Sequence, residues 1–298
     1  MELRVYNRVP GIISLDLPFG SIFTRSTIIR GDNTIVIIDT GIKESHKYIR
    51  DTILEESKSQ DSRFILVSTH EHYDHIGSNF SLQQEFSCVS IAHMEAVPFM
   101  RDHMAQFYNL LGKFPESWGF TQADIANFLS QMDEKTFPTI IFSGNLAIDL
   151  GNRVLEIIET PGHTKGSCSI WDRETRTLIT GDSIGWKGVN NALPQYENVE
   201  DYISSIEKII ALEPSYLITG HFSILENKKE IKSFLEESHS YVYKIEELVS
   251  EGTKKGLTSL REIAEYVCKK LNAKLTPQGL ITINAHLANK GVLQCQKL

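Results

Sequence analysis

The feature that most constrains this chain is a stretch of six residues, 70–75, that reads His-Glu-His-Tyr-Asp-His. It directly follows an apolar run, residues 64–68, that predicts a β-strand. Because the end of a strand fixes the backbone, the loop beyond it can turn alternate side chains toward one point. The first two histidines could then hold one metal ion, and the aspartate and the third histidine a second. Imidazole and carboxylate are the ligands expected for zinc, with manganese or iron as alternatives.

Three later segments share one pattern, in which an apolar run leads through a glycine to a residue of metal-ligand type. They end at His163 (155–163), at Asp182 (176–182) and at His221 (215–221). The glycine lets the backbone turn sharply and approach an ion closely. A site assembled at the ends of several strands requires this arrangement, so the four motifs together predict a metal centre.

Taken in this order, the four motifs resemble the metallo-β-lactamase superfamily of binuclear metallohydrolases, over residues 10–225. The resemblance implies a complete set of seven metal ligands. These are His70, His72 and His163 for the first metal, Asp74, His75 and His221 for the second, and Asp182 as the carboxylate that bridges both.

Two departures narrow the resemblance to certain branches. The lactamases that give the superfamily its name have a cysteine where this chain has Asp182, and Cys168 falls too early to replace it. The flavodiiron branch has a glutamate where His72 stands. The pattern is instead similar to the glyoxalase II, lactonase and ribonuclease Z branches.

The ligand set predicts the chemistry. Two divalent ions, Zn²⁺ first and Mn²⁺ or Fe²⁺ as alternatives, could share a hydroxide, because metal coordination lowers the pKa of water from about 15.7 toward about 7. That bridging hydroxide would be the nucleophile, and Asp74 would both hold the second metal and accept or relay a proton as the catalytic residue. The favoured function is hydrolysis of a small thioester, ester or lactone. The alternatives are phosphodiester or RNA cleavage, a weakly catalytic ligand-binding regulator, and an iron-dependent oxygenase.

Alternation of strand-like and helix-like segments predicts an α/β (α+β) fold, a four-layer αββα sandwich over residues 1–226. Residues 93–138 break the alternation and read as an inserted helical cap. Its aromatic residues are expected either to wall a substrate pocket or simply to pack; they are Phe107, Tyr108, Phe114 and Trp118. Two further histidines, His93 and His103, are interpreted as structural. Asp39 is expected either to orient a metal ligand or to cap the next helix.

Residues 227–298 carry no metal-ligand pattern and predict a helical C-terminal region. Helices are expected over 231–249, 259–271 and from Pro277 onward. Residues 281–293 resemble the last helix and strand of a winged helix. Since this stretch has one basic residue, Lys290, a packing or dimer-forming tail is the favoured interpretation.

Length and composition fit a soluble intracellular enzyme, and we expect its substrate to be a small molecule. The 298 residues are 41% hydrophobic, enough for one large core and an accessory unit, and the net charge of −8 argues against bulk nucleic-acid binding without excluding it. The N-terminus lacks a signal-peptide apolar run and no stretch is long enough to span a membrane, so we expect a cytoplasmic location. The four cysteines form no CxxC pair and are interpreted as buried or half-buried thiols: Cys88, Cys168, Cys268 and Cys295.

Overall fold

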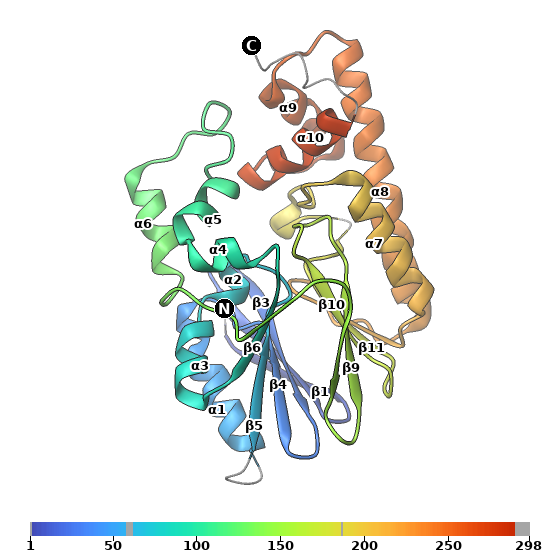
Figure 1. Ribbon diagram of the computed structural model, residues 1–298. Coiled ribbons are helices and arrows are strands. Elements are labelled where there is room, and N and C mark those ends of the chain that lie inside the picture. The colour runs from blue at the N-terminus through green and yellow to red at the C-terminus, as the bar shows by residue number, and fades with distance from the viewer. Residues whose placement is uncertain (1, 58–61, 186, 290–298) are drawn as a thin grey trace.

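Two β-sheets face each other in the computed structural model, which describes residues 2–57, 62–185 and 187–289 (Figure 1). The first sheet has seven strands in sequence order: β1 (Arg4–Val9), β2 (Ile12–Phe19), β3 (Ile22–Arg30), β4 (Thr34–Ile38), β5 (Arg63–Val67), β6 (Val89–His93) and β7 (Ile140–Phe142). The second has the order β12 (Tyr216–Thr219), β11 (Thr177–Gly181), β10 (Cys168–Asp172), β9 (Val154–Glu159) and β8 (Leu146–Asp149). Strands β4 to β7 run parallel, and so do β11 and β12.

Alternation along the strands explains why both faces of the larger sheet are covered. In β4, Val36 and Ile38 join the cluster between the two sheets, whereas Ile35 and Ile37 join the cluster beneath the outer helices. Successive side chains of a strand point to opposite faces, so a strand buried on both faces reads as a continuous apolar run. This burial fixes the register of the strands and therefore the positions of the loops at their ends.

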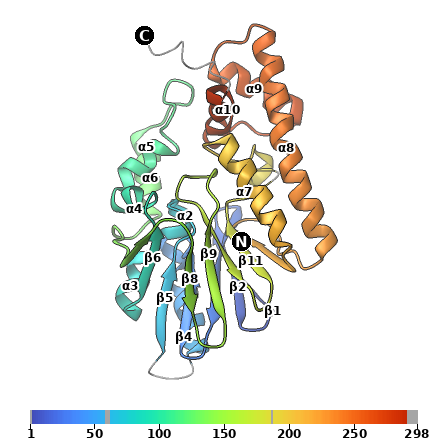
Figure 2. The same cartoon turned by 45° about the vertical axis from the view of Figure 1, so that its right-hand side comes forward.

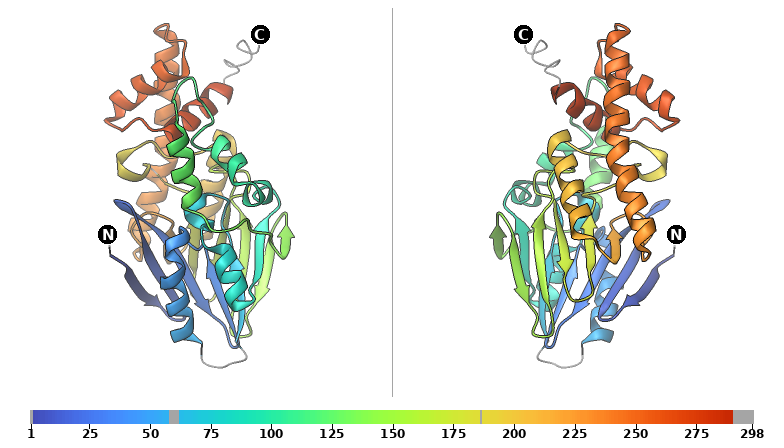
Figure 3. Two further views of the ribbon diagram at one scale, coloured as in Figure 1. Left: turned by 90° about the vertical axis from the view of Figure 1, so that its left-hand side faces the viewer. Right: turned by 90° about the vertical axis from the view of Figure 1, so that its right-hand side faces the viewer.

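Helices cover the outer faces of the sandwich (Figures 1 and 3). Those near the seven-stranded sheet are the 3-10 turn η1 (Lys43–Ser45), α1 (His46–Glu56), α2 (Tyr73–Ile76) and α3 (Asn79–Phe86). On the five-stranded side, η2 (Val189–Asn191) precedes α7 (Val199–Leu212), whose Ile206 and Ile209 pack in one cluster with Leu178 and Leu217 of the sheet. The predicted αββα sandwich is confirmed.

The insertion forms three short helices at the end of the sandwich where the metal-ligand loops lie (Figure 2). They are α4 (Val97–Arg101), α5 (His103–Asn109) and α6 (Gln122–Ser130). Thr121 caps α6 reciprocally with Asp124, in a capping box that the sequence Thr-Gln-Ala-Asp at residues 121–124 is typical of. Gln106 of α5 is buried and donates a hydrogen bond to the carbonyl of Glu71 at 2.6 Å. The insertion is therefore tied directly to the histidine motif.

The C-terminal region consists of α8 (Lys228–Lys254), α9 (Leu260–Leu271) and α10 (Pro277–Asn289). The first of these continues past residue 249, where the sequence predicts its end, and runs through Gly252 to Lys254. Helix α8 packs on α7, and α10 contacts both of them. The predicted terminal strand at residues 291–293 lies outside the described residues.

Several smaller expectations can be compared with the structure. Cys88, Cys168 and Cys268 are buried free thiols, as expected, and Cys295 lies outside the described residues. His93 pairs with Glu159 at 2.7 Å and His103 is half-buried on α5, so neither joins a metal-ligand group in the described chain. Among the described helices, none has the length and apolar composition needed to cross a membrane.

Candidate metal centre

Four loops bring the predicted ligands together, and each loop leaves the end of a strand. Residues 70–75 follow β5, His163 follows β9, Asp182 follows β11 and His221 follows β12. The side chains form three mutually close groups, in which the candidate ligand atoms lie within 4.8 Å of one another. These groups are His70, His72 and His163; His70, His75 and Asp182; and Asp74, His75 and His221. All seven predicted ligands therefore meet at one end of the sandwich.

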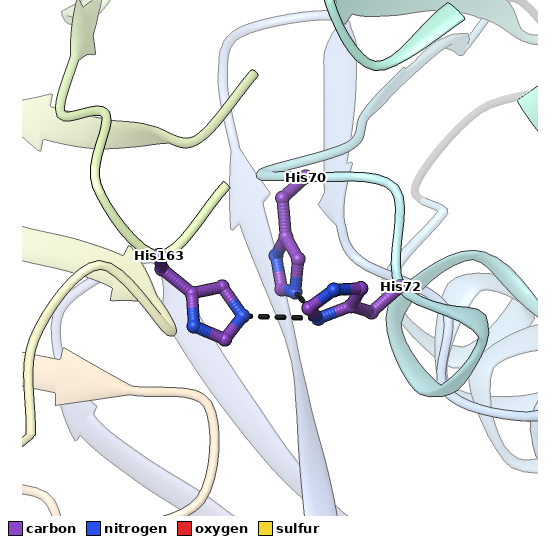
Figure 4. A group of neighbouring side chains, drawn as sticks. All are labelled: His70, His72 and His163. Carbon is purple, nitrogen blue, oxygen red and sulfur yellow. Dashed lines mark hydrogen bonds between the residues drawn. The ribbon is translucent and has the colours of Figure 1, made fainter. Parts of the chain in front are cut away.

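The first group consists of three buried imidazoles that point their ring nitrogens at one another (Figure 4). His72 Nδ1 lies 3.1 Å from His70 Nε2 and 2.9 Å from His163 Nε2. Ligand nitrogens at about 2.0–2.1 Å from a tetrahedral zinc ion lie roughly 3.3 Å apart, close to these separations. This arrangement fits one divalent ion held by three neutral imidazoles.

The second group combines two imidazoles with carboxylates. His221 Nε2 lies 3.3 Å from Asp74 Oδ2 and 3.3 Å from His75 Nε2. Asp182 stands between the groups, with Oδ2 3.1 Å from His221 Nε2 and 3.8 Å from His163 Nε2. Its position suits a carboxylate shared by two ions.

The outward ring nitrogens of four histidines are each fixed by an oxygen. His75 Nδ1 contacts the Asp39 carboxylate at 2.8 Å, and His70 Nδ1 contacts Thr69 Oγ1 at 3.0 Å. His163 and His221 direct their Nδ1 atoms at the carbonyls of Gln195 and Phe23, at 2.8 and 2.7 Å. A carbonyl or carboxylate in this place accepts the N–H of a ligand imidazole, sets its tautomer and leaves Nε2 free for a metal.

Asp39 takes the first of the two roles left open by the sequence. Besides contacting His75, its carboxylate accepts hydrogen bonds from the backbone N–H and the hydroxyl of Thr69, at 2.8 and 2.7 Å. The next helical turn has no side-chain cap. Asp39 therefore orients the histidine motif and does not cap the following helix.

Two glycines meet the predicted need for close approach. A Cβ atom at Gly220 would lie 2.2 Å from Asp182 Oδ1 and 2.9 Å from the ring of His75. Gly162 has φ of +130°, and a Cβ there would lie 2.4 Å from the backbone of Tyr202. Any larger residue at either position would push a ligand loop out of place.

The two groups differ in their electrostatics. Burial lowers the pKa of His70 and of His72 well below the ordinary histidine value, and it also lowers the pKa of His163. Burial opposes the charged form of His221 too, but the carboxylates of Asp182 and Asp74 raise its pKa to about 10. Buried carboxylates thus demand positive charge in the second group, which a divalent ion would supply in place of protons.

A cleft of about 200 Å³ opens onto these ligands. Its wall is mainly apolar and comes from segments far apart in the sequence: Phe19 and Ile22 at the β2–β3 hairpin, Tyr73, Leu110, Ile184, Val189, Ala192, Leu193, Pro194 and Phe222. Thr276 and Gln278, at the start of α10, and Lys187 add polar groups. The cleft is therefore an apolar pocket with the candidate ligands at one side.

The four aromatic residues expected to wall the pocket are placed elsewhere. Phe107 is fully buried in a cluster with Phe128, and the ring of Tyr108 packs against Phe107. Phe114 and Trp118 pack against the C-terminal helices. Phe107, Phe114 and Trp118 thus belong to apolar clusters of the helical layers, which is the second of the two roles left open by the sequence. Leu110 is the contribution of the insertion to the described lining of the cleft.

Comparison with known proteins finds a family and individual relatives by sequence. The family model described as the metallo-beta-lactamase superfamily matches residues 20–221. A human protein named acyl-coenzyme A thioesterase MBLAC2 is 27% identical over 213 residues, which cover 66% of this chain and 72% of that protein. A probable metallo-hydrolase of Methanocaldococcus jannaschii is 29% identical over 197 residues, covering 65% of this chain and 74% of that protein.

Solved structures show the same fold at lower identity. A metallo-beta-lactamase family protein from Thermus thermophilus superposes with a TM-score of 0.74 and 17% identity, covering 96% of this chain and 95% of that one. The sec-alkylsulfatase Pisa1 from Pseudomonas sp. gives a TM-score of 0.67 and 17% identity, covering 99% of this chain and 51% of that one.

Proposed function

Because the chain belongs to the metallo-beta-lactamase superfamily and is a metal-dependent hydrolase, we propose that its reaction is the hydrolysis of a small acyl thioester at a two-metal centre. The observation that carries the proposal is the apolar cleft that opens directly onto the candidate ligands. The human relative named an acyl-coenzyme A thioesterase supports the same substrate class.

The cleft favours an acyl group over a polyanion. Lys187 is the one cationic side chain, apart from the histidine ligands, among the described residues that line it. Proteins that hold a phosphate backbone present several lysines or arginines. An apolar acyl chain would instead gain about 0.8 kcal/mol for each methylene that it buries. We therefore propose that the acyl chain lies against the apolar residues of this cleft, among them Ile22 and Leu193.

The proposed ligands fall into two sets, one for each ion, with one carboxylate common to both. The first ion would be held by His70, His72 and His163 and the second by Asp74, His75 and His221, with Asp182 shared; zinc suits this nitrogen and oxygen set. Bound ions would activate a water molecule and polarise the acyl oxygen.

Asp74 is the proposed catalytic residue of the chain itself. Its carboxylate lies 3.3 Å from His221 Nε2, and its side chain is 12% exposed and lines the cleft. The neighbouring histidines lower its pKa against the opposing effect of burial, so Asp74 is ionised near neutral pH and can accept a proton. We propose that Gln278 and Lys187, which line the cleft, contact the thiol half of the substrate.

A substrate panel tests this proposal. Zinc-reconstituted protein would be assayed with acyl-coenzyme A thioesters of increasing chain length, an aryl ester, a lactone and an activated phosphodiester. We expect the thioesters to have the highest kcat/KM, rising about fourfold per methylene until the cleft is full, since 0.8 kcal/mol corresponds to that factor. The Asp74→Asn variant is the control for contaminating activity. Faster turnover of the phosphodiester, or a rate independent of acyl length, would contradict the proposal.

A further inference from the structure

A short segment, residues 193–196, lies between the candidate metal centre and the C-terminal helices. On one side, the carbonyl of Gln195 contacts Nδ1 of His163 at 2.8 Å. The side-chain amide of the same residue lies 3.4 Å from Nε2 of His72. On the other side, Leu193 belongs to the hydrophobic cluster of α8, α9 and α10. One residue of the segment thus faces two histidines of the first group.

Thr282 of α10 holds the segment on both sides of Gln195. Its hydroxyl donates a hydrogen bond to the carbonyl of Pro194 at 2.5 Å and accepts one from the backbone N–H of Tyr196 at 3.3 Å. The side chain is fully buried. Buried hydroxyls are costly unless satisfied, and here one hydroxyl satisfies two backbone groups that would otherwise lack partners at the helix surface.

His286, one turn further along α10, adds a second polar contact. Its Nε2 lies 2.7 Å from the hydroxyl of Tyr196, and its Nδ1 lies 2.5 Å from the carboxylate of Glu246 on α8. The ring of Tyr196 stacks on Tyr202 with centroids 4.4 Å apart, and Tyr202 lines the cleft. Apolar packing alone would allow the segment to rotate, whereas these hydrogen bonds set the direction of its carbonyls.

We propose that α10 is part of the metal centre: Thr282, supported by His286, acts as a positioning residue that aims the Gln195 carbonyl at His163. The family match ends at residue 221, before this helix begins. The proposal gives the C-terminal region a task beyond packing, namely to fix the orientation of a first-group imidazole. It rests on the proposed role of His163 as a metal ligand.

Metal affinity tests this proposal without relying on turnover. In Thr282→Val the shape is kept and both hydrogen bonds are lost, whereas Thr282→Ser keeps the hydroxyl. Ser238→Ala is the matched control, because Ser238 is equally buried in the C-terminal region but its hydroxyl donates within α8, to the carbonyl of Phe234, and bonds to no other described segment. Zinc dissociation constants would be measured by competition with a chromophoric chelator, and absorption spectra would be recorded after cobalt substitution.

We expect Thr282→Val to weaken binding of the first-group ion by about tenfold, the lower end of the usual range for groups that orient a metal ligand, and to change the cobalt spectrum. Thr282→Ser and Ser238→Ala should match the wild type in both. Should Thr282→Val not fold, Tyr196→Phe provides a second variant, which keeps the stacked ring and loses the hydroxyl. We expect it to change zinc affinity and the cobalt spectrum in the same direction.

Wild-type affinity and spectrum in Thr282→Val, or in Tyr196→Phe where Thr282→Val does not fold, would overturn the proposal. So would an equal loss in Ser238→Ala. A wild-type protein that binds no zinc would overturn this proposal and the proposed function together. Metal binding that depends on Thr282 in a protein that ignores thioesters would support this proposal and refute the thioesterase assignment alone.

Discussion

The two halves of the candidate metal centre are supported by different parts of the molecule. His163 of the first group depends on the Gln195 carbonyl, and the segment that carries it is bound to α10. His75 of the second group depends on Asp39, which follows β4, and His221 depends on the carbonyl of Phe23 on β3. His163 is thus oriented through the C-terminal helices, whereas His75 and His221 are oriented through the seven-stranded sheet.

A buried ion pair strengthens the support of the second half. Arg25 of β3 pairs with Asp16 of β2 at 2.6 Å, and both side chains are 2% exposed. The same guanidinium donates to the carbonyls of Thr219 and Phe222, at 2.7 and 2.6 Å, on either side of His221. This pair joins the two sheets where the ligand loop crosses between them. Separate supports mean that changes in the scaffold should affect the two ions separately.

The largest effect is expected from substitution of Asp74, because two proposed functions of the second group fall on this one residue. Asp74→Asn removes a proposed second-metal ligand and the proposed proton acceptor, so kcat on a thioester should fall by about 10²–10⁴. Metal analysis should show the first ion retained. Circular dichroism should show an unchanged fold, and Asp51→Asn on the exposed surface of α1 serves as the control. Turnover near the wild-type rate would place Asp74 outside the reaction.

Removing the ions should lower the stability of the folded protein through the loss of both metal sites. A ligand present at 100 to 1,000 times its dissociation constant stabilises the folded state by about 2.7 to 4.1 kcal/mol per site. We therefore expect the free energy of unfolding of a chelated sample to be lower than that of a zinc-saturated one by at least this amount. Its denaturation midpoint should be correspondingly lower. Equal midpoints in the two samples would mean that the folded protein holds no ion.

Asp39→Asn should separate the halves. In the wild type, the Thr69 hydroxyl and His75 Nδ1 share one oxygen of the Asp39 carboxylate as their acceptor. The asparagine amide would present an N–H to these donors, so His75 would lose its orientation. Affinity for the second-group ion should fall by about 10- to 100-fold. Affinity for the first-group ion should fall less, because Asp39 contacts His75 directly and His70 through the Thr69 hydroxyl. Stepwise zinc titration measures both constants. Equal loss at both sites would show that the two supports are not independent.

The parts of the molecule that the sequence predicts are those with a local chemical signature. Histidines and aspartates after strand-like runs stand out by residue type, and the structure brings all seven together. The capping box at Thr121 and Pro277 at the start of α10 likewise mark helices where the structure has them. In each case the signal and the structure lie within the same few residues.

The cleft wall and the supports carry no such signature. Ile22 and Leu193 are ordinary apolar residues, 171 positions apart in numbering, and only the closing of the sandwich and the docking of α10 bring them to one cleft. Thr282 is equally inconspicuous, because its hydrogen bonds join segments 88 and 86 residues away. The sequence left the role of the insertion's aromatic residues open for the same reason: Phe107 follows a helical period, but its partner surface is set by tertiary packing.

The smallest effect should come from the wall, and it should spare both metal sites. Ile22 lies at the tip of the β2–β3 hairpin, is half-buried and lines the cleft. Ile22→Ala should lower kcat/KM for a long acyl thioester by about tenfold, since a lost apolar contact in a substrate pocket costs about 1 to 3 kcal/mol. A short acyl substrate should lose less, because it does not reach the hairpin. Tyr108→Ala, which removes an exposed ring of the insertion outside the cleft lining, is the matched control and should keep wild-type kinetics. Zinc affinity should be unchanged in both variants. If Tyr108→Ala were the variant that lost kcat/KM, the substrate would lie against the insertion. The proposal that the acyl chain packs against the residues that line the cleft would then be wrong.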